Sequence, residues 1–421
     1  MRAKTWRAVV GATALLVATS AVSACSSSGS NGKSSASAST TAANTALLGP
    51  LNRATGEPLK IGFIYSGQTQ AADFRDELTL ARATVKYINE HLGGVAGRPL
   101  ELVACADNQS PATAAECANE MVAAHVPAVL QPSPTQPAAI MKVLAAAKVP
   151  YLTRAALDQS VLLSPYGYVM GNPLSVLGTS IKVAKAEGKK KVALFVIDVP
   201  ASAQLSGIAT PLYKKQGLDL LAYAVPLGTP DMTPQVQAAV SKGAESFLVL
   251  GEPAFCISAL KAMKTVGFTG QVVIISQCLS PNIAKAVPGG LDGVKVATME
   301  ARGQKDPDVE RYDAVAARYA PGTPPHESTN ADSYALVLAF ARAMKDLNPS
   351  NVTPATVVQT LNGMSPQPMP LLPGQTFQCN RKVSPLTPAV CSNGAAILTL
   401  DAAGNVKQSE TFDATPYITL G

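Results

Sequence analysis

The segment "AVLQPSPTQPAAIMKVLAAAKVPYLT" (residues 128–153) contains a short apolar run, a longer helical pattern and a second apolar run. Residues 128–131 and 149–153 predict strands, and residues 133–147 between them predict a helix. Two strands joined by a helix in this way form a βαβ unit, in which the strands are parallel. The segment therefore predicts an α/β fold built on a parallel sheet.

The same alternation continues on both sides of this segment. Residues 59–65 and 99–105 predict two earlier strands, each followed by a helical pattern. Residues 306–362 predict mainly helices, and residues 395–412 predict two strands joined at Ala402-Ala403-Gly404. Apolar runs that are typical of strands covered on both faces lie at 192–197, 218–225, 247–250 and 271–276.

The N-terminus has the layout of a secretory signal. Arg2, Lys4 and Arg7 precede an apolar stretch at 8–24 that ends in small residues. A membrane-spanning helix is the alternative, but 17 residues with interspersed Ser, Thr and Gly are fewer than the roughly 20 that a span needs. We therefore expect residues 1–24 to be a signal peptide.

The sequence Val22-Ser23-Ala24-Cys25 resembles the bacterial lipobox, in which the cysteine is acylated and becomes the new N-terminus. Residues 26–45 have no apolar side chain larger than alanine, so they cannot bury enough surface to fold. We expect Cys25 to carry the lipid and residues 25–56 to form a disordered tether. We therefore expect the protein to lie outside the cytoplasm, anchored to the cell membrane.

Composition sets the size and class of the remaining chain. Without residues 1–24 the chain has 421 − 24 = 397 residues, which favours two domains. The formal net charge of +6 falls to +3 once Arg2, Lys4 and Arg7 are removed, which gives no indication of a nucleic-acid partner. The chain is 47% hydrophobic and 15% charged, as expected for a globular protein.

Six cysteines follow Cys25 in three well-separated pairs. In an exported chain an even number indicates disulfides, and six cysteines allow 15 pairings. Metal ligation is the alternative, but no Cys-x-x-Cys occurs and no histidine is near. We expect no metal or other cofactor, and we expect the disulfides Cys105–Cys117, Cys256–Cys278 and Cys379–Cys391.

A serine, threonine or aspartate repeatedly precedes a proline at a predicted helix start. Such pairs supply an N-cap oxygen followed by a proline at the first helical position. Ser133 has Gln136 three residues later, which predicts a capping box. The pairs are Ser110-Pro111, Ser133-Pro134, Thr233-Pro234, Ser280-Pro281, Asp306-Pro307 and Thr353-Pro354.

Six segments follow one another in an order that is typical of one family. They are "LKIGFIYSG" (59–67), "YINEHLGGVAGRPLEL" (87–102), "DNQSPATAAECANEMV" (107–122), "SPTQPAAIMKVLAAAKVPYLT" (133–153), "PDMTPQVQAAVSKGAESFLVLG" (230–251) and "NADSYALVLAFARAM" (330–344). Together they resemble the type I periplasmic binding proteins, in the branch of the leucine/isoleucine/valine receptors. The resemblance implies two α/β lobes that close over a small solute and deliver it to an ABC permease.

The resemblance also implies where the chain crosses between the lobes. We expect crossovers near 166–172, near 295–299 and within 365–395. Lobe 1 would then comprise residues 57–171 and 299–372, and lobe 2 would comprise residues 172–298 and 373–421. We expect the protein to act as a monomer.

Relatives bind the polar head of the ligand with loops that follow the third and fourth strands. These loops correspond here to Gln131 and Ser133 and to Arg154, Ala155 and Ala156, and the loop after the first strand adds Ser66 and Gln68. Asp198, Glu252 and Gln277 follow strands of the second lobe. Arg154 would hold a ligand carboxylate by two hydrogen bonds, the alternative being a surface salt bridge with Asp158.

Three departures disfavour a plain amino acid as the ligand. Where amino-acid receptors have a threonine, this chain has Leu157, and where they have an acid for the ligand ammonium, it has Gln277. A tyrosine expected soon after Asp198 is missing from "DVPAS" (198–202).

The sequence gives no indication of an enzyme. His91, His125 and His326 are isolated in the sequence, and none of the motifs Gly-x-Ser-x-Gly, His-Glu-x-x-His or the phosphate loop occurs. A receptor that presents its closed form to a signalling partner is one alternative to transport, and an exported enzyme is another.

Overall fold

The computed structural model describes residues 46–69, 73–280, 282–327, 329–385 and 387–419. The predicted signal peptide and Cys25 lie outside these residues. Residues 46–56, which we assigned to the disordered tether, are ordered instead. Leu48 is buried, and the backbone amides of Asn52 and Ala54 donate hydrogen bonds to the carbonyls of Glu90 and Asn89. The leucines of this segment supply the apolar surface that the preceding residues lack.

The first sheet has five strands in the order β2-β1-β3-β4-β5. All four neighbouring pairs are parallel, as the βαβ pattern predicts. Its strands are β1 (Leu59–Tyr65), β2 (Leu100–Ala106), β3 (Val129–Gln131), β4 (Tyr151–Thr153) and β5 (Gly167–Val169). The helices between them are α2 (Asp76–His91), α3 (Pro111–Ala123), α4 (Pro137–Ala146) and α5 (Gln159–Leu162).

The second sheet has seven strands in the order β14-β13-β10-β9-β8-β6-β7. Its strands are β6 (Lys191–Ile197), β7 (Asp219–Val225), β8 (Ser246–Leu250), β9 (Gln271–Ile275), β10 (Lys295–Thr298), β13 (Gly394–Leu400) and β14 (Val406–Asp413). The first five are parallel. β13 pairs antiparallel with β10, and β14 pairs antiparallel with β13, as the predicted final hairpin requires.

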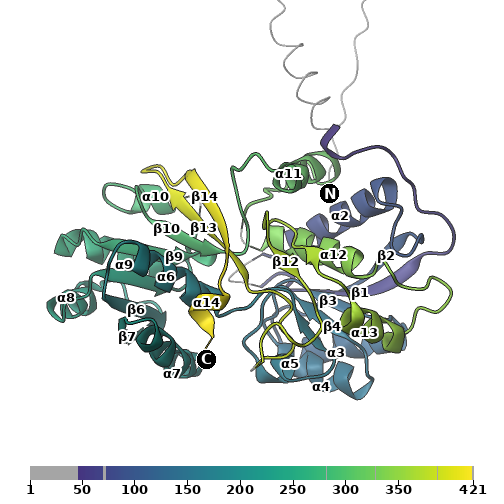
Figure 1. Cartoon of the computed structure of the whole chain (residues 1–421), viewed down its shortest axis with the longest axis horizontal. Helices are drawn as coiled ribbons and strands as arrows, with labels where there is room; N and C mark the ends of the chain where they lie inside the picture. The colour runs from purple at the N-terminus through teal and green to yellow at the C-terminus, as the bar shows by residue number, and fades with distance from the viewer. Residues whose placement is uncertain (1–45, 70–72, 281, 328, 386, 420–421) are drawn as a thin grey trace, which may run out of the picture. The chain divides into compact units, whose positions relative to one another are not determined.

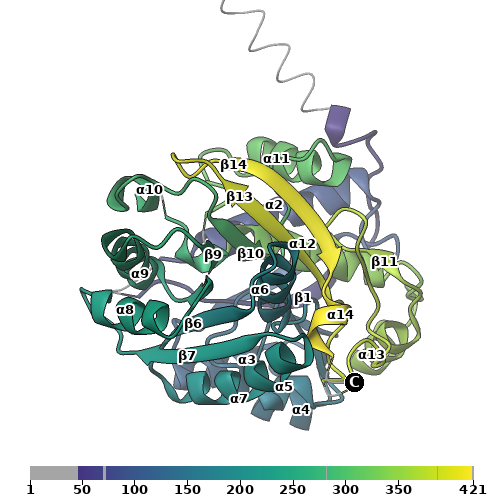
Figure 2. The ribbon, with the colours of Figure 1, turned by 60° about the vertical axis from the view of Figure 1, so that its left-hand side comes forward.

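Helices cover both faces of the second sheet, and the two faces have separate apolar cores. One face carries α6 (Ser175–Ala186), α7 (Pro200–Lys215) and α14 (Thr415–Ile418). The other carries α8 (Thr233–Ser241), α9 (Pro253–Val266) and α10 (Ile283–Ala286), with the 3₁₀ turn Ser276–Cys278 beside them. Figures 1 and 2 show these helices around the sheet. This arrangement explains the continuous apolar runs in the sequence.

Three helices that follow β10 return to the first sheet. They are α11 (Pro307–Tyr319), α12 (Asn330–Ala343) and α13 (Pro354–Gly363). Tyr312, Tyr334 and Leu361 share one core with Ile61 and Phe63 of β1. The chain therefore forms two α/β lobes, each with its own sheet, and crosses between them three times.

The packing differs from the predicted lobe boundary at 372/373. β11 (Gln367–Pro368), β12 (Thr376–Phe377) and the segment up to residue 391 pack on the first lobe. Phe377, Cys379 and Cys391 belong to the core that contains β1, and Val390 pairs with Val169 of β5. The third crossover thus lies at residues 392–393, immediately before β13, near the end of the predicted range.

The predicted helix caps are confirmed at three positions and wrong at two. Ser110, Asp306 and Thr353 accept hydrogen bonds from backbone amides of α3, α11 and α13, and Thr353 forms a capping box with Thr356. The pair at Ser280 includes residue 281, which lies outside the described residues.

The other two helices begin elsewhere. α4 begins at Pro137 with Gln136 at the cap position, so Ser133 caps nothing. Thr233 is the first residue of α8, and its amide donates to Asp231 Oδ1 over 2.8 Å. In α4 the first helical position is taken by a later proline, Pro137. In α8 the Asp231 carboxylate accepts from the first helical amide instead of the Thr233 hydroxyl.

Candidate functional site

The loops after β1 and β3 meet at the carboxyl edge of the first sheet. Ser66 follows β1 directly, and its hydroxyl donates to the carbonyl of Ser133 over 3.2 Å. The Ser133 hydroxyl oxygen is itself buried and has no hydrogen-bond partner of normal geometry among the described residues. Ser66 and Ser133 are thus brought together at this edge, and the Ser133 side chain also lowers the pKa of the neighbouring Glu77.

Glu77, on the first turn of α2, holds this edge together. Its Oε2 accepts from the Ser66 amide over 2.8 Å, and its Oε1 accepts from the Thr329 hydroxyl over 2.7 Å. The side chain is fully buried, and burial raises its pKa to about 7, although the hydrogen bonds from Ser66 and Thr329 partly oppose the rise. Glu77 was not predicted from the sequence, because an acid in the first turn of a helix is ordinary.

Arg154 follows β4 and turns into the protein. Its side chain is 1% exposed; Nε lies 3.3 Å from Asp332 Oδ1, and Nη2 donates to the carbonyl of Met299. Nη1 lies 3.9 Å from the sulfur of Met369. In this arrangement the guanidinium joins α12 and the second crossover to the loop after β4.

The alternative pairing of Arg154 with Asp158 is wrong. Asp158 caps α5, where its Oδ1 accepts from the Ser160 amide over 2.8 Å. Arg154 pairs with Asp332 instead of Asp158. Burial raises the pKa of Asp332 to about 6, against the effect of the Arg154 charge.

A second ionic cluster lies where the chain leaves β10. Glu300 Oε1 lies 2.5 Å from His326 Nδ1, and Glu300 Oε2 accepts from Arg302 over 2.7 Å. The other ring nitrogen of His326, Nε2, lies 2.8 Å from Asp313 Oδ1. Burial lowers the pKa of His326, but its contacts with Asp313 and Glu300 outweigh this and raise the pKa to about 9. His326 is therefore isolated only in sequence.

Gln131 is the last residue of β3, and its side chain points into the protein. It is fully buried; its amide donates to Asp107 Oδ2 over 2.8 Å, and its carbonyl accepts from the Tyr151 hydroxyl over 2.6 Å. These contacts use both ends of the side-chain amide. The remaining predicted residues of this lobe differ in exposure: Gln68 is exposed, Ala155 is half-buried and Ala156 is buried.

The predicted residues of the second lobe lie in three separate loops. Asp198 follows β6 and is exposed, and Gln277 is exposed in the 3₁₀ turn after β9. Glu252 caps α9, where its two oxygens accept from the amides of Ala254 and Phe255, each over 2.8 Å. Asp198 and Gln277 thus present polar side chains to solvent at the carboxyl ends of their strands, where open α/β sheets bind ligands.

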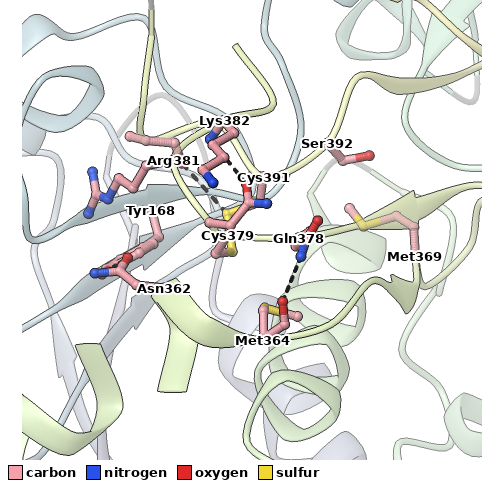
Figure 3. Close-up of a disulfide and its surroundings, with 12 residues drawn as sticks. Tyr168, Asn362, Met364, Met369, Gln378, Cys379, Arg381, Lys382, Cys391 and Ser392 are labelled. Carbon is pink, nitrogen blue, oxygen red and sulfur yellow. Dashed lines mark hydrogen bonds between the residues drawn. A yellow bond between two sulfur atoms is a disulfide. The ribbon is translucent and has the colours of Figure 1, made fainter. Parts of the chain in front are cut away.

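All three predicted disulfides are confirmed: Cys105–Cys117, Cys256–Cys278 and Cys379–Cys391. The second joins the start of α9 to the turn that carries Gln277. The third lies beside the third crossover (Figure 3). There the Cys391 amide donates to the Val169 carbonyl over 2.8 Å, and Arg381 stacks on the Tyr168 ring at 4.4 Å.

No group of three or more metal-ligating side chains is arranged around a common point in the described part of the chain. Nor does any described helix have both the length and the apolar character needed to cross a bilayer.

The sequence pattern of the family described as "Periplasmic binding protein" matches residues 58–393. The chain therefore belongs to the periplasmic binding proteins, a family of binding proteins and not of enzymes. A comparison with curated proteins found no match.

Solved structures with the same fold include three whose names mention a ligand class. The fatty acid ABC transporter substrate-binding protein of Thermomonospora curvata is 16% identical (TM-score 0.68; 86% of this chain and 95% of that chain). A Rhodopseudomonas palustris solute-binding protein in complex with 4-hydroxybenzoate is 19% identical (TM-score 0.67; 85% and 97%). LivJ of Streptococcus pneumoniae, in complex with isoleucine, is 17% identical (TM-score 0.66; 85% and 99%). At these identities the likeness establishes the two-lobed fold alone.

Proposed function

We propose that the protein is an extracytoplasmic solute receptor, anchored by a lipid on Cys25, that delivers a small organic molecule to an ABC permease. The observation that carries this proposal is the pair of sheets whose carboxyl-end loops hold Ser66 and Ser133 in one lobe and Asp198 and Gln277 in the other. The family membership and the transporter names of similar structures support it. The receptor acts as a monomer and has no catalytic activity of its own.

The ligand is a neutral or carboxylate molecule and not a free branched-chain amino acid. A bound amino acid takes an ammonium out of water, and an unpaired buried charge costs several kcal/mol. Gln277 carries no charge, and the carboxylate of Glu252 already accepts two backbone hydrogen bonds. Asp198 follows a different strand, β6, and would have to reach the place of Gln277 from there. Arg154 is engaged by Asp332 and Met299, so it contributes to a carboxylate site by its charge and by placing its loop.

A thermal-shift panel tests the ligand class. A ligand at about 100 times its Kd stabilises the fold by roughly 2.7 kcal/mol. We expect a shift with members of a carboxylate panel, 4-hydroxybenzoate among them, and none with leucine, isoleucine or valine. A clear shift with millimolar leucine restores the amino-acid interpretation.

Cell fractionation tests the anchor. Because one acyl chain gives only marginal anchoring and two give stable anchoring, we expect the mature protein to carry more than one. The Cys25→Ala variant should move to the soluble fraction. A variant that stays with the membrane through detergent-free washing overturns the lipid anchor and leaves the solute receptor intact.

A further inference from the structure

A pocket of about 220 Å³ opens between α5 and α7, beside the first crossover. Leu157, Leu162 and Leu163 form its wall on the first lobe, and Leu174, Leu205 and Ile208 form its wall on the second. The described residues that line it include polar side chains but no charged one. The pocket therefore favours an uncharged, apolar group.

Two leucines that line this pocket on the first lobe are unusually exposed. Leu157 is 49% exposed and Leu163 is 58% exposed, and both belong to a set of only six large hydrophobic side chains that are exposed in the described residues. A single exposed leucine is ordinary, whereas exposed leucines at the mouth of an apolar pocket indicate a binding surface. Leu157 also lies in the loop after β4, directly after three of the candidate ligand-binding residues, Arg154, Ala155 and Ala156.

We propose that this pocket is a second subsite, which holds the apolar end of the solute whose polar head lies between the two lobes. The inference rests on the proposed solute-receptor function and narrows its ligand to an elongated molecule with an alkyl chain or one aromatic ring. One loop relates the polar site to the pocket, because the candidate residues Ala155 and Ala156 directly precede Leu157, which lines the pocket. For comparison, an engineered apolar cavity of about 150 Å³ binds benzene, so 220 Å³ accommodates a ring or a short chain.

The position of the pocket also relates binding to movement of the lobes. Leu162 belongs to a core of the first lobe, whereas Leu205 and Ile208 pack against a core of the second. Asn172 lies between them in the crossover itself. A group that fills the pocket therefore contacts both lobes at once and stabilises the arrangement in which the two walls are close.

The test is a chain-length series measured by calorimetry on the purified protein. The probes are straight-chain carboxylates from butanoate to decanoate and the matching primary amides, which separate a charged head from a neutral one. Burial of each methylene is worth about 0.8 kcal/mol, so we expect about a fourfold gain in affinity per methylene until the pocket is full. Ile208→Trp fills the pocket and Leu163→Asp places a charge at its mouth. Leu227→Asp is the matched control, because Leu227 is 64% exposed and does not line the pocket.

We expect both pocket variants to flatten the dependence on chain length while the short probes bind as before, and we expect the control to keep it. If affinity does not depend on chain length in the unmodified protein, the subsite proposal is wrong. It is also wrong if neither pocket variant changes that dependence. Neither result contradicts the receptor function. Failure of every probe also overturns the subsite, and the receptor function is then judged by whether the protein co-purifies with a different small molecule.

Discussion

Asn172 Nδ2 donates a hydrogen bond to Asn393 Oδ1 over 2.9 Å, and the two residues lie in two different crossovers. The backbone repeats this link, because the Asn172 amide donates to the carbonyl of Ser392 over 2.9 Å. Both asparagines are almost fully buried. The first and third crossovers are therefore fastened to each other, so that any hinge motion moves them together.

Asn172→Ala should destabilise the fold, because it leaves the buried Asn393 oxygen and the Leu174 amide without their partner. We expect the free energy of unfolding to fall by about 1–3 kcal/mol, measured by chemical denaturation. Asn119→Ala, on the exposed side of α3, should change it by less than about 0.5 kcal/mol. Equal effects of the two variants would show that the link between the crossovers is energetically unimportant.

Glu77→Gln should change how stability depends on pH. The pKa of Glu77 is raised to about 7 in the folded protein from an ordinary 4.5, so its contribution is fully present below about pH 4.5 and is lost as the pH rises through 7. The pKa shift corresponds to a fall of about 3 kcal/mol in the free energy of unfolding across this pH window. Denaturation curves between pH 4.5 and 8 should show a shallower decline for the variant. Parallel curves for the variant and the unmodified protein would refute the raised pKa, and the exposed Glu187→Gln should leave the curve unchanged.

His326 should titrate far above an ordinary histidine. Its contacts with Asp313 and Glu300 raise its pKa to about 9, so its stabilising charge is present below pH 6.5 and is lost as the pH rises through 9. The chain has three histidines, so NMR can follow the ring of each through a titration. His326→Asn assigns the signal. A midpoint near 6.5 for this signal would mean that the Glu300–His326 contact does not persist in solution.

The disulfides Cys105–Cys117 and Cys379–Cys391 form a matched pair, because each joins residues 12 positions apart. Replacing both cysteines of either disulfide with alanine should cost about 3 kcal/mol through the chain entropy of the unfolded state. Only the loss of Cys379–Cys391 should also raise hydrogen exchange at residues 169–174, because the Cys391 amide donates a hydrogen bond to the Val169 carbonyl next to the first crossover. Equal exchange at 169–174 in the two double variants would contradict this local role.

Much of the fold could be predicted because its signals are local. Most strands of the two sheets coincide with segments that the sequence predicts as strands, and the disulfides follow from cysteines that are close in sequence. β5 and β10 are exceptions, because they lie in segments that we expected to be crossovers. The packing of residues 373–391 on the first lobe could not be predicted, since it depends on contacts such as that of Val390 with Val169. The order of residues 46–56 likewise depends on contacts with α2.

The site was less predictable than the fold, because its partners are far apart in the chain. Thr329 and Glu77 are 252 residues apart, and Arg154 and Asp332 are 178 apart, and no local pattern relates either pair. Ser133 was identified by its position after a strand, yet its expected role as a helix cap was wrong. Residues near the site could be predicted because they follow the carboxyl ends of strands. The contacts of each side chain could not, because they depend on the tertiary structure.

Native mass spectrometry of the gently purified protein tests the central claim most directly. If the protein is a receptor for an elongated neutral or carboxylate solute, we predict one small organic molecule per chain that has an alkyl or aromatic body and no α-amino group. One molecule of leucine, isoleucine or valine per chain would contradict the account.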